Sequence, residues 1–218
     1  MQPCKTCFMN DCLYKEMGRI DFDLCWEEMK QFTSRRTNDS QDEIWLVEHN
    51  HIYTQGLNGK DENILKENNI PIKKIDRGGQ VTYHGPGQLI FYFMVDIFRM
   101  NLSVSNFIVA LENVIINTLA GFDIQSFGNR SAPGVYVENK KVASIGVRIK
   151  KGRSYHGLAL NFNNDLAPFD DIHTCGIPGL EVTSISKINK TIQRLTLIDS
   201  MLSSAQREFG YRSIKSLN

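Results

Sequence analysis

The chain has 218 residues, a hydrophobic share of 41%, a charged share of 22% and a formal net charge of +1. This length suits one well-buried core, so we expect a single domain over residues 1–218. The near-zero charge argues against a general polyanion binder, and nucleic acid is not an expected partner. No run reaches the roughly 18 apolar residues of a membrane span and no signal peptide is recognisable, so we expect a cytoplasmic protein with no membrane partner.

The first third of the chain predicts one helix followed by short strands. Apolar residues at helical spacing indicate a helix over 21–32, and the polar stretch 35–42 indicates a loop. The expected elements that follow are a strand at 43–49, an extended segment at 53–56, an exposed helix or loop at 60–69 and a strand at 72–76. Residues 1–20 predict no element.

Residues 77–88, Arg-Gly-Gly-Gln-Val-Thr-Tyr-His-Gly-Pro-Gly-Gln, form the most informative segment. Four glycines and a proline allow a tight turn and a close approach of the backbone to another group. A plain hairpin turn is the simple interpretation. The donors and acceptors crowded into the same turn favour a binding site carried by rigid strands.

The rest of the chain predicts a central strand, two long helices and a meander. The strand at 89–95 is apolar on both faces, which is typical of a strand covered on both sides. The remaining expected elements are a helix at 103–120, strands at 134–138, 141–149 and 156–162, and a helix at 191–209. Together these elements predict an α+β fold with a mixed, largely antiparallel sheet flanked by helices.

Five cysteines form an odd set, and reduced thiols are expected rather than disulfides. Cys4, Cys7 and Cys12 have the spacing of a metal knuckle, but a structural zinc site needs four ligands and no second close pair exists, so we predict no metal. Cys25 lies in the first predicted helix. Cys175 stands alone in a loop bounded by glycine and proline, where a cysteine is either a small buried residue or a nucleophile.

Lys141 is unusual because it enters an apolar strand. Strict alternation would place it on the same face as Ala143, Ile145 and Val147, opposite to Lys140. Lys141 therefore either occupies an apolar pocket or ends a solvated turn together with Lys140. The residues alone leave both readings open.

Several motifs in combination resemble lipoate-protein ligase B, the lipoyl(octanoyl) transferase family. The resemblance covers residues 43–185, and its motifs are residues 77–88, Lys141-Val142-Ala143-Ser144-Ile145-Gly146, Tyr155-His156-Gly157-Leu158-Ala159-Leu160-Asn161 and Thr174-Cys175-Gly176, with support from residues 45–49, 53–56, 132–137 and 165–169. One departure is Thr174, because the family commonly has proline before the cysteine. The familial fold is that of biotin and lipoate ligase catalytic domains.

This resemblance implies an enzyme that moves an octanoyl or lipoyl group from the thioester of acyl carrier protein to a lysine of a lipoyl domain. The implied acceptors are lipoyl domains of 2-oxoacid dehydrogenases and the glycine-cleavage H protein. A thioester is already activated, so neither ATP nor another cofactor is implied. An ATP-dependent lipoate ligase and a non-catalytic lipoyl-domain binder are the alternatives.

By the same resemblance, Cys175 is the nucleophile and Lys141 its partner, acting either as a base or within a thiolate–ammonium pair. The implied substrate-binding residues are Arg77, Gly78, Gly79, Gln80, Val81, Thr82, Tyr83, His84, Ser144, Ile145, Gly146, Gly157, Leu158 and Ala159. We expect His84 and His156 to be pocket walls and His173 to be incidental. Donors near Gly157 or Gly176 are candidates for stabilising an oxyanion.

Overall fold

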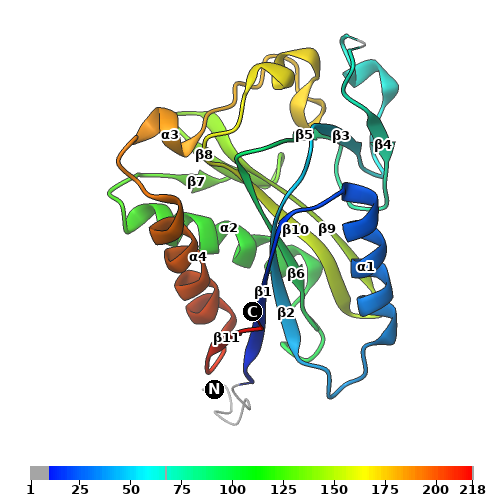
Figure 1. Cartoon of the computed structure of the whole chain (residues 1–218), viewed down its shortest axis with the longest axis vertical. Coiled ribbons are helices and arrows are strands. Elements are labelled where there is room, and N and C mark those ends of the chain that lie inside the picture. The colour runs from blue at the N-terminus through cyan, green and yellow to red at the C-terminus, as the bar shows by residue number, and fades with distance from the viewer. Residues whose placement is uncertain (1–9, 67, 218) are drawn as a thin grey trace.

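The computed structural model describes residues 10–66 and 68–217, and its frame is one large sheet with helices on both faces (Figure 1). The strands lie in the order β11 (Ile214–Ser216), β1 (Cys12–Arg19), β2 (Asp42–Glu48), β6 (Gln88–Met94), β10 (Arg153–Asn161), β9 (Lys140–Lys150), β8 (Gly134–Val137) and β7 (Phe127–Gly128). β1 runs parallel to β11 and β2, and every other neighbouring pair is antiparallel. The predicted mixed, largely antiparallel sheet is confirmed.

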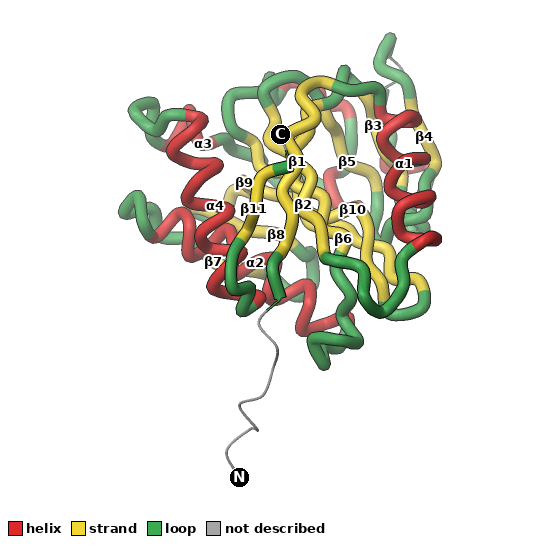
Figure 2. Tube along the Cα trace, turned by 60° about the horizontal axis from the view of Figure 1, so that its bottom comes forward, coloured by secondary structure: helices red, strands yellow, loops and turns green. Residues whose placement is uncertain are grey.

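Helix α1 (Phe22–Arg35) covers one face of the sheet, and α2 (Val104–Ala120) and α4 (Arg194–Phe209) cover the other (Figure 2). Side chains cap the first two helices, because Asp21 accepts the N–H groups of Asp23 and Leu24 and Ser103 accepts that of Asn106. α4 ends at Gly210 in the left-handed conformation. All three helices lie where apolar periodicity predicted them. Of the described helices, none is long and apolar enough to cross a membrane.

Strand β6 is buried along its whole length because both of its faces are covered. Phe91 and Phe93 join the cluster under α2 and α4, whereas Ile90 and Tyr92 join the cluster under α1. This explains the unbroken apolar run in the sequence. β6 is hydrogen-bonded to β2 on one side and to β10 on the other, so it holds both strands in place.

A small sheet lies beside one end of the large one (Figure 1), with the strand order β4 (Ile72–Lys74), β3 (Ile52–Gln55) and β5 (Val81–His84). The short helical segments are η1 (Asp61–Asn63), η2 (Ala167–Asp171), η3 (Thr174–Gly176) and α3 (Ile185–Ile188). β5 packs against η3, the turn that carries Cys175. The glycine-rich segment therefore contributes a strand as well as turns.

Several elements were not expected. β1 lies within residues 1–20, for which no element was expected, β7 lies between the predicted helix at 103–120 and strand at 134–138, and β11 follows the last predicted helix. Charged residues in β1 and β11 obscure the alternation that would predict a strand. Residues 60–69 contain a single turn, η1, among the described positions. Cys4 and Cys7 lie outside the described residues, and Cys12 is fully buried in β1.

Asp42, the first residue of β2, is the centre of a buried polar cluster. Its carboxylate is almost fully buried, forms ion pairs with Arg36 and Arg99, and accepts the hydroxyl of Tyr211 at 3.1 Å. It also accepts the backbone N–H of Asp96 at 2.9 Å. These bonds satisfy a charge that would otherwise be costly to bury.

We predict that Asp42→Ala lowers the free energy of unfolding by about 3–5 kcal/mol, because it leaves the buried guanidinium of Arg36 without its partner. Urea denaturation measures this difference. Asp39→Ala, at an exposed position of the neighbouring loop, is the control and should change stability by less than about 0.5 kcal/mol. Equal effects of the two substitutions would contradict the role given to Asp42.

Candidate active site

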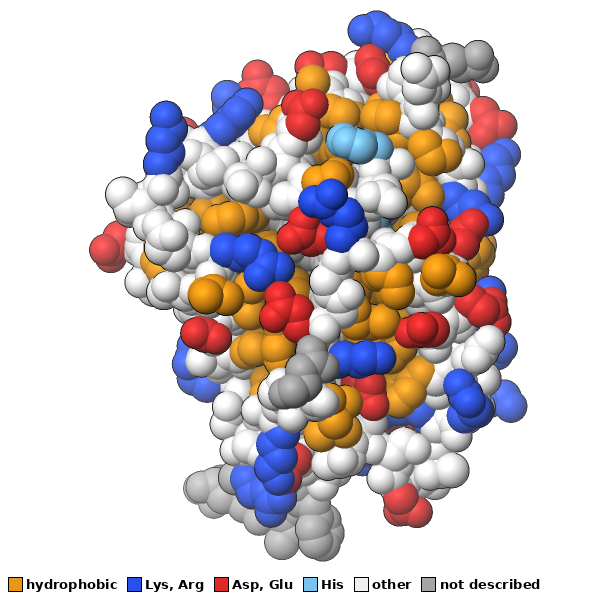
Figure 3. All heavy atoms as spheres, in the orientation of Figure 1, with side chains coloured by type: hydrophobic (Ala, Val, Ile, Leu, Met, Phe, Trp, Pro, Cys, Tyr) orange, Lys and Arg blue, Asp and Glu red, His pale blue; other side chains and the backbone are white. Residues whose placement is uncertain are grey.

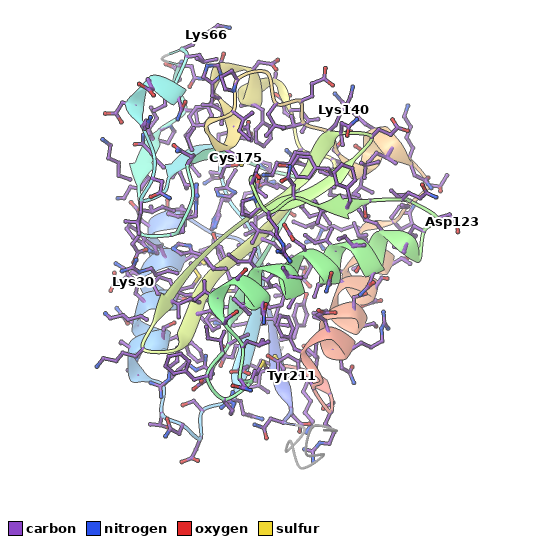
Figure 4. The ribbon with its side chains drawn as sticks, turned by 180° about the vertical axis from the view of Figure 1, so that it is seen from behind. Lys30, Lys66, Asp123, Lys140, Cys175 and Tyr211 are labelled. Atoms are coloured by element: carbon purple, nitrogen blue, oxygen red, sulfur yellow. The ribbon has the colours of Figure 1, made fainter. Side chains whose placement is uncertain are left out.

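Lys141 and Cys175, far apart in sequence, meet beside a cavity that Cys175 lines. Lys141 Nζ lies 2.9 Å from Cys175 Sγ, and the lysine is only 1% exposed, whereas Cys175 is partly buried. The neighbouring Lys140 is half exposed and pairs with Glu181. In Figure 4, Cys175 is labelled where its turn meets the sheet, and Lys140 is labelled nearer the outer edge. The structure thus supports the pocket reading of Lys141 and excludes the solvated-turn reading.

Two carbonyl groups complete the surroundings of the Lys141 amine. Nζ donates to Pro133 O at 2.9 Å and to Ala132 O at 3.3 Å. Gly134 makes room for this side chain, because a Cβ there would lie 2.5 Å from Lys141 Cε. Three acceptors, including Cys175 Sγ, match the three hydrogens of an ammonium group.

A β-bulge, rather than strict alternation, sets the direction of Lys141. In the β8–β9 pair, Val135 lies opposite Ala143 and Tyr136 lies opposite Lys141, so Val142 is the extra residue. Val142 and Ala143 both enter the core on the α2 side. The expectation that Lys141 shares a face with Ala143 is therefore wrong.

Glu112 fixes the loop whose carbonyl groups bind Lys141, and the sequence did not predict this role. This buried carboxylate on α2 accepts the N–H of Gly134 at 3.0 Å. A glutamate within an apolar helix stripe is the signal that could have revealed it.

Cys175 lies on a strained turn. Its φ of 58° and the φ of 71° at Gly176 are both left-handed, a conformation that costs a non-glycine residue roughly 1–2 kcal/mol. The turn is held by hydrogen bonds from His173 N to Asn63 O at 2.8 Å and from Gly176 N to His173 O at 2.7 Å. Such strain at a reactive side chain is common in functional sites.

The cavity beside Cys175 has a volume of about 440 Å³, within the usual range for small-molecule sites. The predicted binding residues that line it are Arg77, Gly78, Gly79, Gln80, Val81, Thr82, His84, Ser144, Ile145, Gly146, Gly157, Leu158 and Ala159. Tyr83 does not line it, because its side chain packs with Tyr53 and Phe169 in a separate cluster. Apolar side chains that were not predicted complete the walls, namely Phe22, Ile75, Ile90, Val104, Ile108 and Val147.

Arg77 places a buried guanidinium in the cavity wall. Nη2 donates to Thr54 O at 2.6 Å and to Thr54 Oγ1 at 3.0 Å, and Nη1 donates to Gly78 O. A Cβ at Gly146 would lie 2.9 Å from Arg77 Cδ, and one at Gly56 would lie 3.0 Å from Nη1. Burial lowers the pKa of Arg77 to about 10, so it remains a cation at neutral pH. Within the described chain it pairs with no carboxylate.

His49 and His84 lie side by side, with His84 in the cavity wall, and both are neutral. His49 donates from Nδ1 to Ile20 O and accepts the Tyr92 hydroxyl at Nε2. His84 lines the cavity, donates from Nδ1 to Gln88 Oε1 and contacts the Thr54 hydroxyl through Nε2. Burial lowers the pKa of His49 to about 4 and that of His84 to about 3.

His156 also lines the cavity and adopts a positive φ of 60° within β10. Its Nε2 lies 3.3 Å from Asp76 Oδ1, and Tyr155 and Trp26 donate to the same carboxylate. Burial alone would raise the pKa of Asp76, but these hydrogen bonds hold it well below its usual range. Burial is also the main reason that the pKa of His156 is lowered. As expected, both His84 and His156 are wall residues.

In Figure 3, acidic and basic side chains are interspersed over the face shown. Among the described residues, no group of three His, Cys, Asp or Glu side chains could hold a metal ion.

We predict that the protein loses stability as the pH falls from about 7 to 5. His49 and His84 take up protons near pH 6.5 in the unfolded chain but stay neutral in the folded protein, because burial lowers their pKa values to about 4 and about 3, so each contributes up to about 1.4 kcal/mol per pH unit. Urea unfolding across this range measures the slope. His49→Gln keeps a donor and an acceptor but removes one titrating ring, so the slope should fall by one such contribution. Equal slopes in the two proteins would contradict this assignment.

Thr174 offers a second prediction, because its buried hydroxyl has no hydrogen-bond partner within the described chain. Thr174→Val removes an unsatisfied polar atom and keeps the shape, so it should raise the free energy of unfolding by about 1 kcal/mol. The control is Thr191→Val, at an exposed position where the hydroxyl donates to Asn189. That substitution should be neutral or slightly destabilising. A loss of stability in Thr174→Val would show that the hydroxyl does have a partner.

Comparison with known proteins agrees with the motifs. Residues 23–206 match the family described as the lipoyl protein ligase A/B catalytic domain. The octanoyltransferase of Vibrio campbellii is 49% identical over 174 residues, covering 80% of this chain and 79% of the relative. The octanoyltransferase of a Marinomonas species is 43% identical over 201 residues, covering 92% and 94%.

Solved structures show the same fold at low sequence identity. A bi-partite lipoate protein ligase from Thermoplasma acidophilum superposes with a TM-score of 0.75 at 12% identity, covering 96% of this chain and 88% of that one. The biotin protein ligase of Aquifex aeolicus gives a TM-score of 0.55 at 12% identity, covering 93% and 71%. The expected biotin and lipoate ligase fold is confirmed. The match to the family over most of the chain and the identity to curated relatives establish that this chain belongs to the lipoyl protein ligase A/B catalytic domain family, among its octanoyltransferases.

Proposed function

We propose that this protein transfers an octanoyl group from the thioester of acyl carrier protein to a lysine of a lipoyl domain, through an acyl-enzyme on Cys175. The observation that carries the mechanism is the 2.9 Å contact between the buried Lys141 amine and Sγ of Cys175, which lines a largely apolar cavity. The relatives' activity supports the reaction. We propose one catalytic domain for the whole chain, with residues 43–185 bearing the motifs.

The resting pair is best described as an ammonium and a thiolate. Lys141 Nζ faces two carbonyl oxygens and Cys175 Sγ, and an ammonium group can donate one N–H to each of the three. A thiolate is the reactive form of cysteine and accepts a charge-assisted hydrogen bond. Of the two roles left open for Lys141, we therefore propose the ion pair as the starting state.

The reaction follows in two steps. The Cys175 thiolate attacks the thioester carbonyl, a new C–S bond forms, the carrier's thiolate departs, and Lys141 gives it a proton. The amine of the acceptor lysine then attacks the acyl-enzyme and expels the Cys175 thiolate. Lys141 takes up the amine's proton, so the ion pair is restored and the acyl group ends in an amide.

The cavity is suited to hold the acyl chain during both steps. Its walls come from the glycine-rich segment, from β9 and β10, and from apolar side chains of α1 and α2. The glycines leave the backbone accessible next to the bound chain. We propose that acceptors include lipoyl domains of 2-oxoacid dehydrogenases and the glycine-cleavage H protein.

An ATP-dependent lipoate ligase is the second candidate, since structural neighbours with this fold include lipoate protein ligases. Such an enzyme would activate a free acid and would need no thiol at position 175. A non-catalytic lipoyl-domain binder would need neither Cys175 nor Lys141. The experiment that separates the three is an assay with octanoyl-acyl carrier protein in the absence of ATP.

We predict that the protein then gains one octanoyl mass, that peptide mapping places it on Cys175, and that the mass moves to an added apo lipoyl domain. Cys175→Ala should abolish the adduct. Lys141→Met should slow its formation by about 100-fold or more, because the proton donor and the ion-pair partner are both lost. Lys140→Met is the matched control on the exposed neighbour and should acylate within twofold of wild type.

Two results would contradict the mechanism. Transfer that requires ATP and free octanoate would assign the protein to the ligase class. Wild-type rates of acylation in Lys141→Met would remove Lys141 from the mechanism while leaving Cys175 as the nucleophile.

A further inference from the structure

Attack on a thioester creates a negatively charged oxygen that needs hydrogen-bond donors, and removing one such donor typically costs 10²–10³ in rate. The inference that follows rests on the proposed acyl transfer at Cys175. The candidate donors are N–H groups beside Cys175 that have no acceptor in the resting protein.

The backbone around Cys175 supplies one such donor. The N–H of Gly176, a candidate on sequence grounds, is already bonded to His173 O. Gly157, the other candidate, lies within the ladder between Tyr92 of β6 and Gly146 of β9. The N–H of Cys175 itself has no acceptor in the part of the chain that the structure describes.

The side chain of Gln80 lies directly against the Cys175 turn. A Cβ placed on Gly176 would be 3.0 Å from Gln80 Cδ and 3.1 Å from Gln80 Cγ. Gln80 also lines the cavity together with Cys175. Its amide is therefore close to the place where the thioester must bind.

Asn63 determines which end of the Gln80 amide is available. Asn63 Nδ2 donates to Gln80 Oε1 at 3.1 Å, so the oxygen is engaged and Nε2 remains as the donor. Gln80 Nε2 has no acceptor among the described residues. Asn63 is 6% exposed, and its backbone carbonyl accepts the N–H of His173, two residues before Cys175. One buried residue thus fixes both the turn and the amide.

We propose that Gln80 is a further catalytic residue, whose Nε2 and the N–H of Cys175 bind the thioester carbonyl oxygen as it becomes negative. Asn63 is its positioning residue. When the thiolate attacks, the carbonyl π pair moves to the oxygen and is held by these two donors. This electron pair re-forms the C=O π bond when the carrier's thiolate leaves, so the two donors transfer no proton.

The test compares two reactions of Cys175 in wild type, Gln80→Met and Asn63→Leu. Acylation by octanoyl-acyl carrier protein passes through an oxyanion, whereas alkylation by iodoacetamide displaces iodide directly and forms none. Gln80→Met should acylate about 100-fold to 1000-fold more slowly but be alkylated at Cys175 within twofold of wild type. Gln31→Met, on the exposed face of α1, is the matched control and should change neither rate.

Asn63→Leu should slow acylation by about 10-fold, and the double variant should be no slower than Gln80→Met, because Asn63 acts through the amide. Unchanged acylation in Gln80→Met would overturn the proposal. So would a parallel loss of alkylation, which would mean that Gln80 only supports the turn. Absence of any adduct in wild type would instead refute the proposed function itself.

Discussion

Keeping the amine of Lys141 out of water is the constraint on which the rest of the site depends. An amine that is 1% exposed must find its hydrogen-bond partners inside the protein. Two of them are backbone carbonyls of a loop that Glu112 fixes from α2. The third is the sulfur of Cys175. The two carbonyl groups and the sulfur together replace the water that the amine has lost.

Lys141 and Cys175 belong to different parts of the fold. Lys141 is the second residue of β9 in the large sheet, whereas Cys175 lies on a turn packed against β5 of the small sheet. Arg77 links the two sheets, since it bonds to Thr54 on β3 while its stem lies on Gly146 of β9. Gly78 N also donates to Val147 O at 2.9 Å. The volume of the Arg77 side chain explains the glycine at position 146, where a Cβ would lie 2.9 Å from Arg77 Cδ.

Much of this arrangement was predictable, and the reasons differ from one element to another. The long helices and the apolar strand β6 repeat their pattern over many residues, and the glycine-rich segment has a composition that turns require. β1 and β11 could not be predicted because they are completed by pairing with distant residues, Cys12 with Ile214 for example. Pairing between residues so far apart produces no pattern in the local sequence.

The structure brings most residues of the predicted site together around one cavity, but the motifs did not indicate their geometry. The motifs indicated Cys175 and Lys141, but a single extra residue, Val142, reverses the face that alternation assigns to Lys141. Tyr83 has the same composition cues as its neighbours yet points into another cluster. Asn63 accepts the N–H of His173 through its backbone carbonyl and orients the Gln80 amide, whereas Glu112 accepts the backbone N–H of Gly134. No side-chain pattern in the sequence reveals such roles.

The pairing of β1 with β11 has a consequence for how the protein is made. β1 is synthesised well before Ile214–Ser216, which form one of its two neighbouring strands, and before Tyr211, which donates a hydrogen bond to Asp42. One edge of β1 therefore stays open until residues 214–216 have been synthesised. A nascent chain stalled before residue 211 would carry an unpaired strand edge, the kind of surface that chaperones cover and that promotes association between incomplete chains.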